Sequence, residues 1–213
     1  MKNFLPKQYK KTTKLKINHS YLVEQFADYS KIFKEIEKII KKGDYTLGQK
    51  VDEFEKKFAK RTGAKFVIAV GNGTDALYLS LKALNIGKGD EVITSPLSFI
   101  ASASSIIHVG AKPVFVDINI DDYLIDVNKI EEVINKKTRA IIPVNMYGQC
   151  ADYEKILAIA KKNKLLVIED CAQSVGSFYK KKPSGSFGHL SAFSFYPTKN
   201  LGAYWDGGFI GTS

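Results

Sequence analysis

The chain has few cysteines and no long hydrophobic run, and each absence excludes a class of protein. Only two of its 213 residues are cysteine, Cys150 and Cys171. Two are too few for a disulfide framework and are typical of a reducing compartment, so we predict a cytoplasmic location. No stretch approaches about 18 uncharged apolar residues, which argues against a membrane-spanning helix. The start, MKNFLPKQYKK, has no apolar segment behind it, so no signal peptide is predicted.

The composition is that of a globular protein with a basic start. Apolar residues make up 45% and charged residues 25%, and the length suffices for a substantial core in one large domain or two small ones. The net charge is +10, and the first 16 residues contain six lysines and no acid. We therefore predict a basic N-terminal arm over residues 1–20 and one domain over 21–213. The arm is a solvated tail or binds an anionic surface, and a nucleic-acid partner is not favoured.

The first part of the domain predicts two amphipathic helices. Between residues 21 and 42, apolar side chains recur at helical spacing, and Gly43 is a typical residue for the end of such a helix. Residues 51–61 follow the same pattern, with Phe54 and Phe58 on one face.

From residue 66 onwards, short apolar runs alternate with helical segments. Such alternation indicates βαβ units, and strands without polar positions are typical of a parallel sheet that is covered on both faces. The fold class predicted is therefore α/β, with a doubly wound, mostly parallel sheet. Ligands of such sheets bind beyond the carboxyl ends of the strands. The expected strands are 66–70, 91–95, 113–116, 140–144, 165–169, 192–195 and 209–211, and the expected helices are 74–84, 99–108, 127–134 and 153–162.

A glycine-containing turn, Gly71-Asn-Gly-Thr74, follows the first of these strands. Its N–H groups and the positive end of the next helix favour a phosphate, with Thr74 available as the helix cap; a plain capped turn explains the turn equally well. The Gly-x-Gly-x-x-Ala spacing also matches a loose dinucleotide pattern. That pattern needs an acid at the end of the next strand, whereas Asp90 and Glu91 lie at its start, so a nicotinamide site is not favoured.

Two ionisable side chains follow apolar strands. Asp170 comes after the run LLVIE, where a carboxylate is costly unless a cation meets it. Asp170 is therefore either a helix cap or the partner of a buried positive charge. Lys199 follows a short apolar strand and Pro197. It is either a solvated lysine, which composition alone favours, or an amine nucleophile with a lowered pKa.

Taken together, these motifs resemble the DegT/DnrJ/StrS family of sugar aminotransferases over roughly residues 21–213. The combination of Glu-Asp-x-Ala-Gln with a later Ser-Phe-x-x-x-Lys is the most specific part of the resemblance. It implies the type I aspartate-aminotransferase fold, whose large domain binds pyridoxal phosphate (PLP). The matching stretches are Tyr45-Thr-Leu-Gly48, Val51-Asp-Glu-Phe54, Gly71-Asn-Gly-Thr-Asp-Ala-Leu77, Gly89-Asp-Glu-Val-Ile93, Pro113-Val-Phe-Val-Asp117, Met146-Tyr-Gly-Gln149, Ile168-Glu-Asp-Cys-Ala-Gln-Ser174, Phe193-Ser-Phe-Tyr-Pro-Thr-Lys-Asn-Leu-Gly202 and Asp206-Gly-Gly208.

The resemblance implies a chemical role for three residues. Lys199 is expected to be the catalytic lysine, which holds PLP through a Schiff base and later moves protons at the substrate carbon. Asp170 is expected to face the pyridine nitrogen and keep it protonated, so that the ring can accept electrons. Gln173 is expected to contact the ring beside its 3-hydroxyl group.

Four further cofactor contacts follow from the same resemblance. Gly73, Thr74 and Ser194 resemble the phosphate-binding cup of the family, which agrees with the helix-end argument. Phe99 occupies the position of the aromatic residue that stacks on the ring, and the alternative is a phenylalanine of the core. No metal site is expected.

Other candidate residues carry weaker signals. His108 lies among apolar neighbours on an expected helix and is interpreted as structural. His189 precedes the strand before Lys199, and its sequence context leaves a role in the pocket open. Cys171 is interpreted as a packed small side chain, because reactive thiols need an exposed electropositive setting. Tyr147 borders the substrate site or packs as an ordinary aromatic residue.

The chain departs from the family pattern at two points. Trp205 stands where the family has glycine, and a bulky ring there clashes or requires a different backbone, since only glycine adopts positive φ freely. Family members are also nearly twice as long, as the resemblance implies. The remainder would carry a small C-terminal domain and an Asn and basic residues that complete the site, so a fragment, a truncated reading frame and one piece of a split enzyme all stay open.

The function implied by the resemblance is transamination. PLP would carry an amino group, with glutamate as donor, to the ketone of a nucleotide-linked sugar, giving an amino sugar for polysaccharide or glycosylated metabolites. The Pro-Thr-Lys-Asn-Leu-Gly loop resembles most the loop of family members that act at sugar C3. A homodimer without membrane association is expected. The alternative is a truncated, non-catalytic relative that binds PLP or a partner without turnover.

Overall fold

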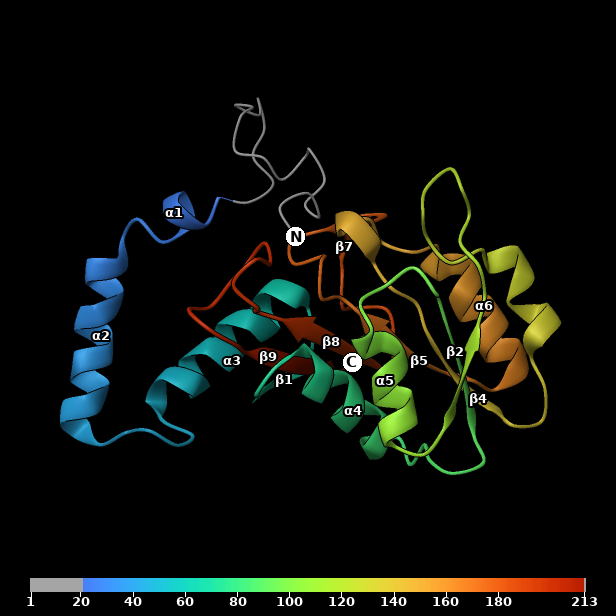
Figure 1. The fold of residues 1–213 in the computed structure, drawn as a ribbon, viewed down its shortest axis with the longest axis horizontal. Helices are drawn as coiled ribbons and strands as arrows, with labels where there is room; N and C mark the ends of the chain where they lie inside the picture. Colours follow the sequence, from blue (N-terminus) through green and yellow to red (C-terminus); the bar gives the residue numbers. More distant parts are fainter. Residues whose placement is uncertain (1–20, 213) are drawn as a thin grey trace, which may run out of the picture. The chain divides into compact units, whose positions relative to one another are not determined.

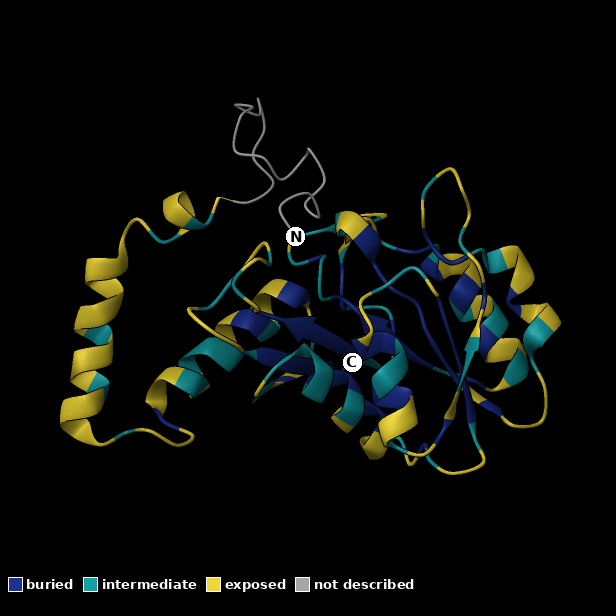
Figure 2. Cartoon of the chain, viewed as in Figure 1, coloured by how far each residue is buried: buried dark blue, intermediate teal, exposed yellow. Residues whose placement is uncertain are grey.

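The computed structural model describes residues 21–212, and the chain divides into two compact units, Met1–Lys42 and Gly43–Ser213. The predicted basic arm, residues 1–20, lies outside the described residues. The described part of the first unit contains helices α1 (Leu22–Gln25) and α2 (Tyr29–Lys42), neither of which has a buried residue (Figures 1 and 2). The single helix expected over 21–42 is wrong, because a tight turn, in which the N–H of Ala27 bonds to Glu24, separates the two.

The second unit is built on a seven-stranded sheet (Figure 1). Its strand order is β1-β9-β8-β5-β4-β2-β3, and the five strands from β8 to β3 run parallel. Only β9 is antiparallel to its two neighbours. The predicted mostly parallel α/β sheet is therefore confirmed. The strands are β1 (Phe66–Val70), β2 (Glu91–Thr94), β3 (Lys112–Phe115), β4 (Thr138–Ile142), β5 (Leu166–Asp170), β8 (Leu190–Ser194) and β9 (Gly208–Thr212), beside a small hairpin of β6 (Phe178–Tyr179) and β7 (Lys182–Pro183).

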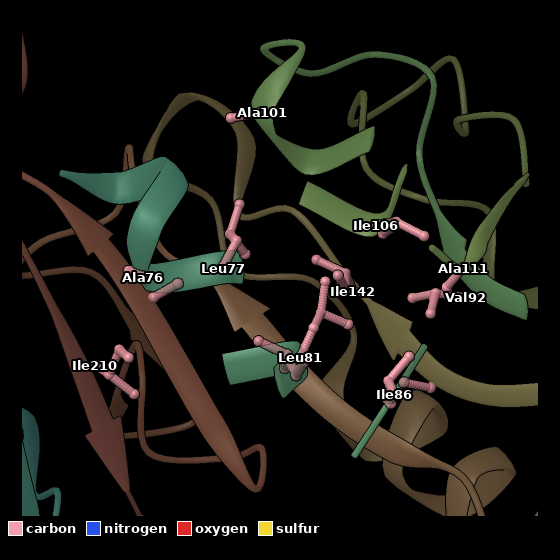
Figure 3. Packing of buried hydrophobic residues seen from close by; sticks show 13 residues of the cluster. Ala76, Leu77, Leu81, Ile86, Val92, Ala101, Ile106, Ala111, Ile142 and Ile210 are labelled. Carbon is pink, nitrogen blue, oxygen red and sulfur yellow. The ribbon is translucent and has the colours of Figure 1, made fainter. Parts of the chain in front are cut away.

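Helices cover both faces of the sheet because its strands are apolar at successive positions. On one face, α4 (Gly73–Ala83) and α5 (Ala101–His108) pack on side chains such as Ile142 and Ile210 (Figure 3). Neighbouring strand residues such as Ile141 point to the other face, where α6 (Tyr153–Asn163) packs. No helix of the described residues is long and apolar enough to cross a bilayer.

An aromatic cluster on this second face attaches α3 (Gln49–Thr62) to the strands that lead to the site. Phe58 of α3 contacts Phe193 of β8 and Phe209 of β9, and the latter two rings stack with centroids 4.2 Å apart. Aromatic stacking of this kind contributes energy beyond area burial. Helix α3 therefore packs against β8 and β9, the two strands that flank the loop carrying Lys199.

Two further expected elements differ from those in the structure. Residues 127–134 form two short 3₁₀ helices, η2 (Val127–Lys129) and η3 (Glu131–Val133), because Asp126 caps a turn by accepting the Asn128 N–H and the backbone is extended by Ile134. Strand β1 lies at the sheet edge and is not buried on both faces. Phe66 and Ile68 are 60% and 52% exposed.

Candidate active site

The predicted site residues come from segments that meet at one edge of the sheet. Val70, Gly208 and Ser194 are register partners across β1, β9 and β8. The turn that follows β1 therefore lies beside the carboxyl end of β8. Strand β5, which is parallel to β8, ends at Asp170 at the same edge. This is where ligands of open α/β sheets bind.

Asn72 caps helix α4, and the prediction that Thr74 does so is wrong. The Asn72 side chain accepts a hydrogen bond from the Asp75 N–H at 2.8 Å, and the helix begins at Gly73, one residue before the expected start. The extended backbone of Asn72 places its short amide in capping position. Thr74 thus lies inside the first helical turn, and its hydroxyl is not used as the cap.

The start of α4 approaches β8 more closely than a side chain would allow. A Cβ added to Gly73 would lie 2.7 Å from the Ser194 Cβ. The N–H groups of Gly73 and Thr74, at the first two helical positions, have no acceptor within the helix, as at any helix start. The Ser194 Oγ accepts the Tyr196 N–H at 3.3 Å, so its own proton remains available to donate. Backbone donors, a helix end and a hydroxyl together suit a phosphate.

Asp170 is a carboxylate buried at the end of β5, only 4% exposed. Its Oδ2 accepts a hydrogen bond from the Ser102 hydroxyl at 2.7 Å, and its Oδ1 accepts one from the Ala172 N–H at 3.2 Å. No helix follows Asp170, so the helix-cap interpretation is wrong. Burial raises the pKa of Asp170, against the opposing effects of these two donors and the charge of Lys199. A cationic ring nitrogen placed beside this carboxylate would offset the cost of its burial.

Lys199 lies half-buried in the loop after β8. Its backbone N–H donates to the Tyr196 carbonyl at 2.8 Å, which fixes the loop. Burial lowers the pKa of the Lys199 amine, and the charge of Asp170 opposes this shift. A lowered pKa increases the neutral, nucleophilic fraction of an amine near neutral pH. The environment therefore differs from that of a freely solvated surface lysine.

Gln173 and Phe99 occupy the loops that flank Asp170. The Gln173 Oε1 accepts the Tyr147 N–H at 3.0 Å. Tyr147 is exposed and has a φ of 55°, a conformation that costs energy for a bulky residue. Phe99 is 68% exposed, which rules out a core position, and its carbonyl accepts the Ser102 N–H at 3.2 Å. Phe99 is thus one helical turn from the residue that bonds to Asp170.

Several candidates from the sequence do not reach this site. His189 precedes β8 at the opposite end of that strand, where its Nδ1 accepts the Val167 N–H at 3.0 Å. His108 is exposed at the end of α5. Cys171 is buried, and burial raises the pKa of its thiol well above the ordinary value, which suits a packed side chain. Trp205 is 78% exposed and its backbone is not left-handed, so the substitution for glycine requires no positive φ.

Sequence reasoning missed Ser102 and Glu169. The fully buried Glu169 carboxylate accepts N–H bonds from Gly185 (2.9 Å), Phe187 (2.6 Å) and Gly188 (2.7 Å). It therefore ties the turn before β8 to β5, on the face opposite Asp170. The available signal was an acid inside an apolar strand, which is costly unless donors surround it. Ser102 gave no signal, because its partner lies 68 residues away.

The chain is similar to known aminotransferases. Residues 27–213 match the model of the DegT/DnrJ/EryC1/StrS aminotransferase family. The chain is 47% identical to a UDP-2-acetamido-2-deoxy-3-oxo-D-glucuronate aminotransferase of Pseudomonas aeruginosa, over 84% of this chain and 50% of that protein. It is 50% identical to a dTDP-3-amino-3,6-dideoxy-alpha-D-galactopyranose transaminase of Aneurinibacillus thermoaerophilus, over 83% of this chain and 48% of that protein.

The fold is also that of a solved structure with bound cofactor. The crystal structure of NtdA from Bacillus subtilis, with bound cofactor PMP, superposes with a TM-score of 0.86 and 33% identity. The match covers 96% of this chain and 47% of NtdA. The chain spans about half the length of the relatives it matches.

Proposed function

Because the chain belongs to the DegT/DnrJ/EryC1/StrS aminotransferase family, we propose that it binds PLP and transfers an amino group from glutamate to a keto group of a nucleotide-linked sugar. The observation that carries the proposal is a buried carboxylate, Asp170, at the end of β5 and a half-buried amine, Lys199, in the loop after β8, whose charges act on each other. A buried acid whose bonded donors are both uncharged is costly unless a cationic ligand joins it.

The residues of the site would divide the chemistry between them. When bound, PLP supplies an aldehyde that carries the amino group and a ring that accepts electrons. The Lys199 Nζ would bind the cofactor carbon with release of water and would be displaced from it by the incoming amine. The freed Lys199 amine would then take and return the proton at the substrate carbon. The Asp170 carboxylate would hold the proton on the ring nitrogen. Gln173 would contact the ring near its 3-hydroxyl group, and Phe99 would cover one ring face.

The start of α4 would hold the phosphate. The N–H groups of Gly73 and Thr74, the Thr74 hydroxyl and the Ser194 hydroxyl supply neutral donors, and the helix end supplies a positive potential. A phosphate anchored there would fix the distance between the ring and Lys199, which is how positioning lowers a barrier.

We propose sugar C3 as the position that receives the amino group. The two relatives described above have names that place the oxo or amino group at C3. Their nucleotides and sugars differ, so the proposal extends to the class of 3-keto nucleotide sugars and not to one compound. A homodimer and a cytoplasmic location belong to the same proposal; the two unpaired cysteines support the latter.

Reductive trapping tests the proposal. The 213-residue chain is incubated with PLP, reduced with borohydride and mapped by mass spectrometry. We expect one label per chain, on Lys199, and none there in Lys199→Ala. Lys161→Ala, which removes an exposed lysine, is the matched control and should keep the label on Lys199.

A second arm tests turnover. A chain labelled on Lys199 is then given glutamate and a 3-keto nucleotide sugar, and the amino-sugar product is measured. Labelling with no product would favour a PLP-binding, non-catalytic relative. Label scattered over many lysines, or none, would refute the proposed cofactor site.

A further inference from the structure

We infer that Ser102, supported by Ser98, is a positioning residue that holds the Asp170 carboxylate ionised and directed for its cationic partner. This inference rests on the proposed function, and it concerns two serines of which neither the sequence motifs nor the relatives' names say anything. A chain of two short hydrogen bonds joins Ser98 to Ser102 and Ser102 to Asp170.

The first link is the contact between Ser102 and Asp170. Ser102 is buried in the first turn of α5, and its hydroxyl donates to the Asp170 Oδ2 at 2.7 Å, within the range of a strong bond to a charged acceptor. The other carboxylate oxygen accepts only a longer bond, 3.2 Å, from the Ala172 N–H. Ser102 is therefore the closest side-chain donor to a buried carboxylate whose placement decides where a cation can bind.

The second link fixes the direction of the first. The hydroxyls of Ser98 and Ser102 lie 2.7 Å apart. Because the Ser102 proton is donated to Asp170, Ser98 donates to Ser102, and a donor polarised in this way is a stronger donor itself. Ser98 is half-buried and lies next to Phe99, the expected ring-stacking residue. The segment 98–102 would thus fix the positions of both the stacking residue and the Asp170 carboxylate.

No charged group around Asp170 among the described residues replaces Ser102 in keeping the Asp170 carboxylate ionised. Lys199, from the loop after β8, is the cation that acts on Asp170. Burial lowers the pKa of Lys199 and so reduces the fraction of this amine that is charged. From β5, Glu169 points to the opposite face, and the neighbouring Cys171 thiol stays protonated because burial raises its pKa. Burial raises the pKa of Asp170, and among the groups that oppose this rise Ser102 acts most strongly.

The experiment measures the titration of Asp170 directly. The chain is labelled with ¹³C at aspartate carboxyls, and the Asp170 signal is identified by its loss in Asp170→Asn. Without PLP, we expect Ser102→Ala to move the Asp170 midpoint to higher pH and Ser98→Ala to move it less, in the same direction. Ser102→Thr, which restores a hydroxyl, should move it back towards the wild-type value.

Ser80→Ala is the matched control. Ser80 is a fully buried serine of α4 whose hydroxyl has no partner among the described residues, so its removal should leave the midpoint unchanged. In a second measurement, the dissociation constant for PLP should rise about tenfold in Ser102→Ala, the loss expected for one hydrogen bond to a charged group. Ser80→Ala should leave this constant unchanged.

A folded Ser102→Ala with the wild-type Asp170 midpoint would overturn the inference. If Ser102→Ala does not fold, Ser98→Ala decides, and a wild-type midpoint in that variant would overturn it equally. The two proposals fail separately. A wild-type chain that does not bind PLP refutes the proposed function, whereas the carboxyl titration needs no cofactor and still tests Ser102.

Discussion

Lys199 and Asp170 influence each other's charge across the candidate site. Burial lowers the pKa of Lys199, and the negative charge of Asp170 acts in the opposite direction. The same Lys199 charge acts to lower the pKa of Asp170. Each side chain therefore sets part of the protonation state of the other, and a change at one should be measurable at the other.

We predict that Lys199 reacts with amine reagents at lower pH than an exposed lysine does. Only the neutral amine is nucleophilic, and burial moves the pKa of Lys199 below 10.5. Asp170→Asn removes the charge that stabilises the ammonium, so its Lys199 midpoint should fall further. Competitive labelling over a pH series, read by mass spectrometry, measures both midpoints.

Lys161 in the same chain is the internal reference for this labelling, since its side chain is exposed. Asp121→Asn, at an exposed loop position, is the control for the Asp170 substitution. A Lys199 midpoint that rises in Asp170→Asn would show that the two charges do not interact as described.

At the scale of elements, the contact between α4, β8 and β9 depends on glycines. A Cβ added to Gly208 would lie 2.6 Å from the carbonyl carbon and oxygen of Asn72 and 2.7 Å from the Phe193 carbonyl oxygen. All three are backbone atoms, which cannot rotate away as a side chain can. The absence of a side chain at Gly208 therefore allows the start of α4 to lie against the sheet.

We predict that Gly208→Ala destabilises the protein and weakens phosphate binding together. The added methyl group must push β9 away from Asn72, at a cost of about 2 kcal/mol. For a chain of this size that cost lowers Tm by about 6 °C. Thermal unfolding measures the first effect, and titration with PLP and with phosphate-free pyridoxal measures the second. The loss of affinity should be larger for PLP.

Gly207→Ala is the matched control, because the nearest atom to its added Cβ would lie at an ordinary contact distance of 3.5 Å. Equal losses in both variants would attribute the effect to the flexibility of the glycine pair. The close approach of Gly208 to Asn72 would then not explain the losses of stability and affinity.

At the scale of the whole molecule, the core and the candidate site belong to one of the two units. All four apolar clusters consist of residues from 54 onwards, and every proposed site residue lies beyond residue 72. Helices α1 and α2 contribute no buried residue. The unit Gly43–Ser213 therefore contains the packing that positions Lys199.

We predict that a chain lacking residues 1–42 keeps the site. Its Tm should stay within about 2 °C of the full chain, since none of the described residues 21–42 is buried and the loss of unburied residues costs little stability. Borohydride trapping should still label Lys199 once per chain. Lys199→Ala in the shortened chain is the control. Loss of labelling at Lys199 in a folded shortened chain would contradict this assignment.

Local patterns in the sequence were sufficient for much of the fold and the chemistry. Apolar runs without alternation predicted the buried parallel strands. A strand that is covered on both faces needs apolar side chains at successive positions, whichever helices pack on it. The motifs around Asp170 and Lys199 predicted an acid and an amine near strand ends, because Asp170 is the last residue of β5 and Lys199 lies in the loop after β8. These features depend on neighbours in the chain, so the sequence alone determined them.

Other features depended on residues that are distant in sequence, and only the tertiary structure decided them. Strand β1 is apolar like the inner strands, and its edge position results from pairing with β9 alone. Asn72 took the capping role expected for Thr74 because its backbone is extended where α4 meets β8. Ser102 reaches Asp170 only because α5 packs on the face of the sheet to which that carboxylate points. Such contacts carry no local pattern, since folding alone brings the partners together.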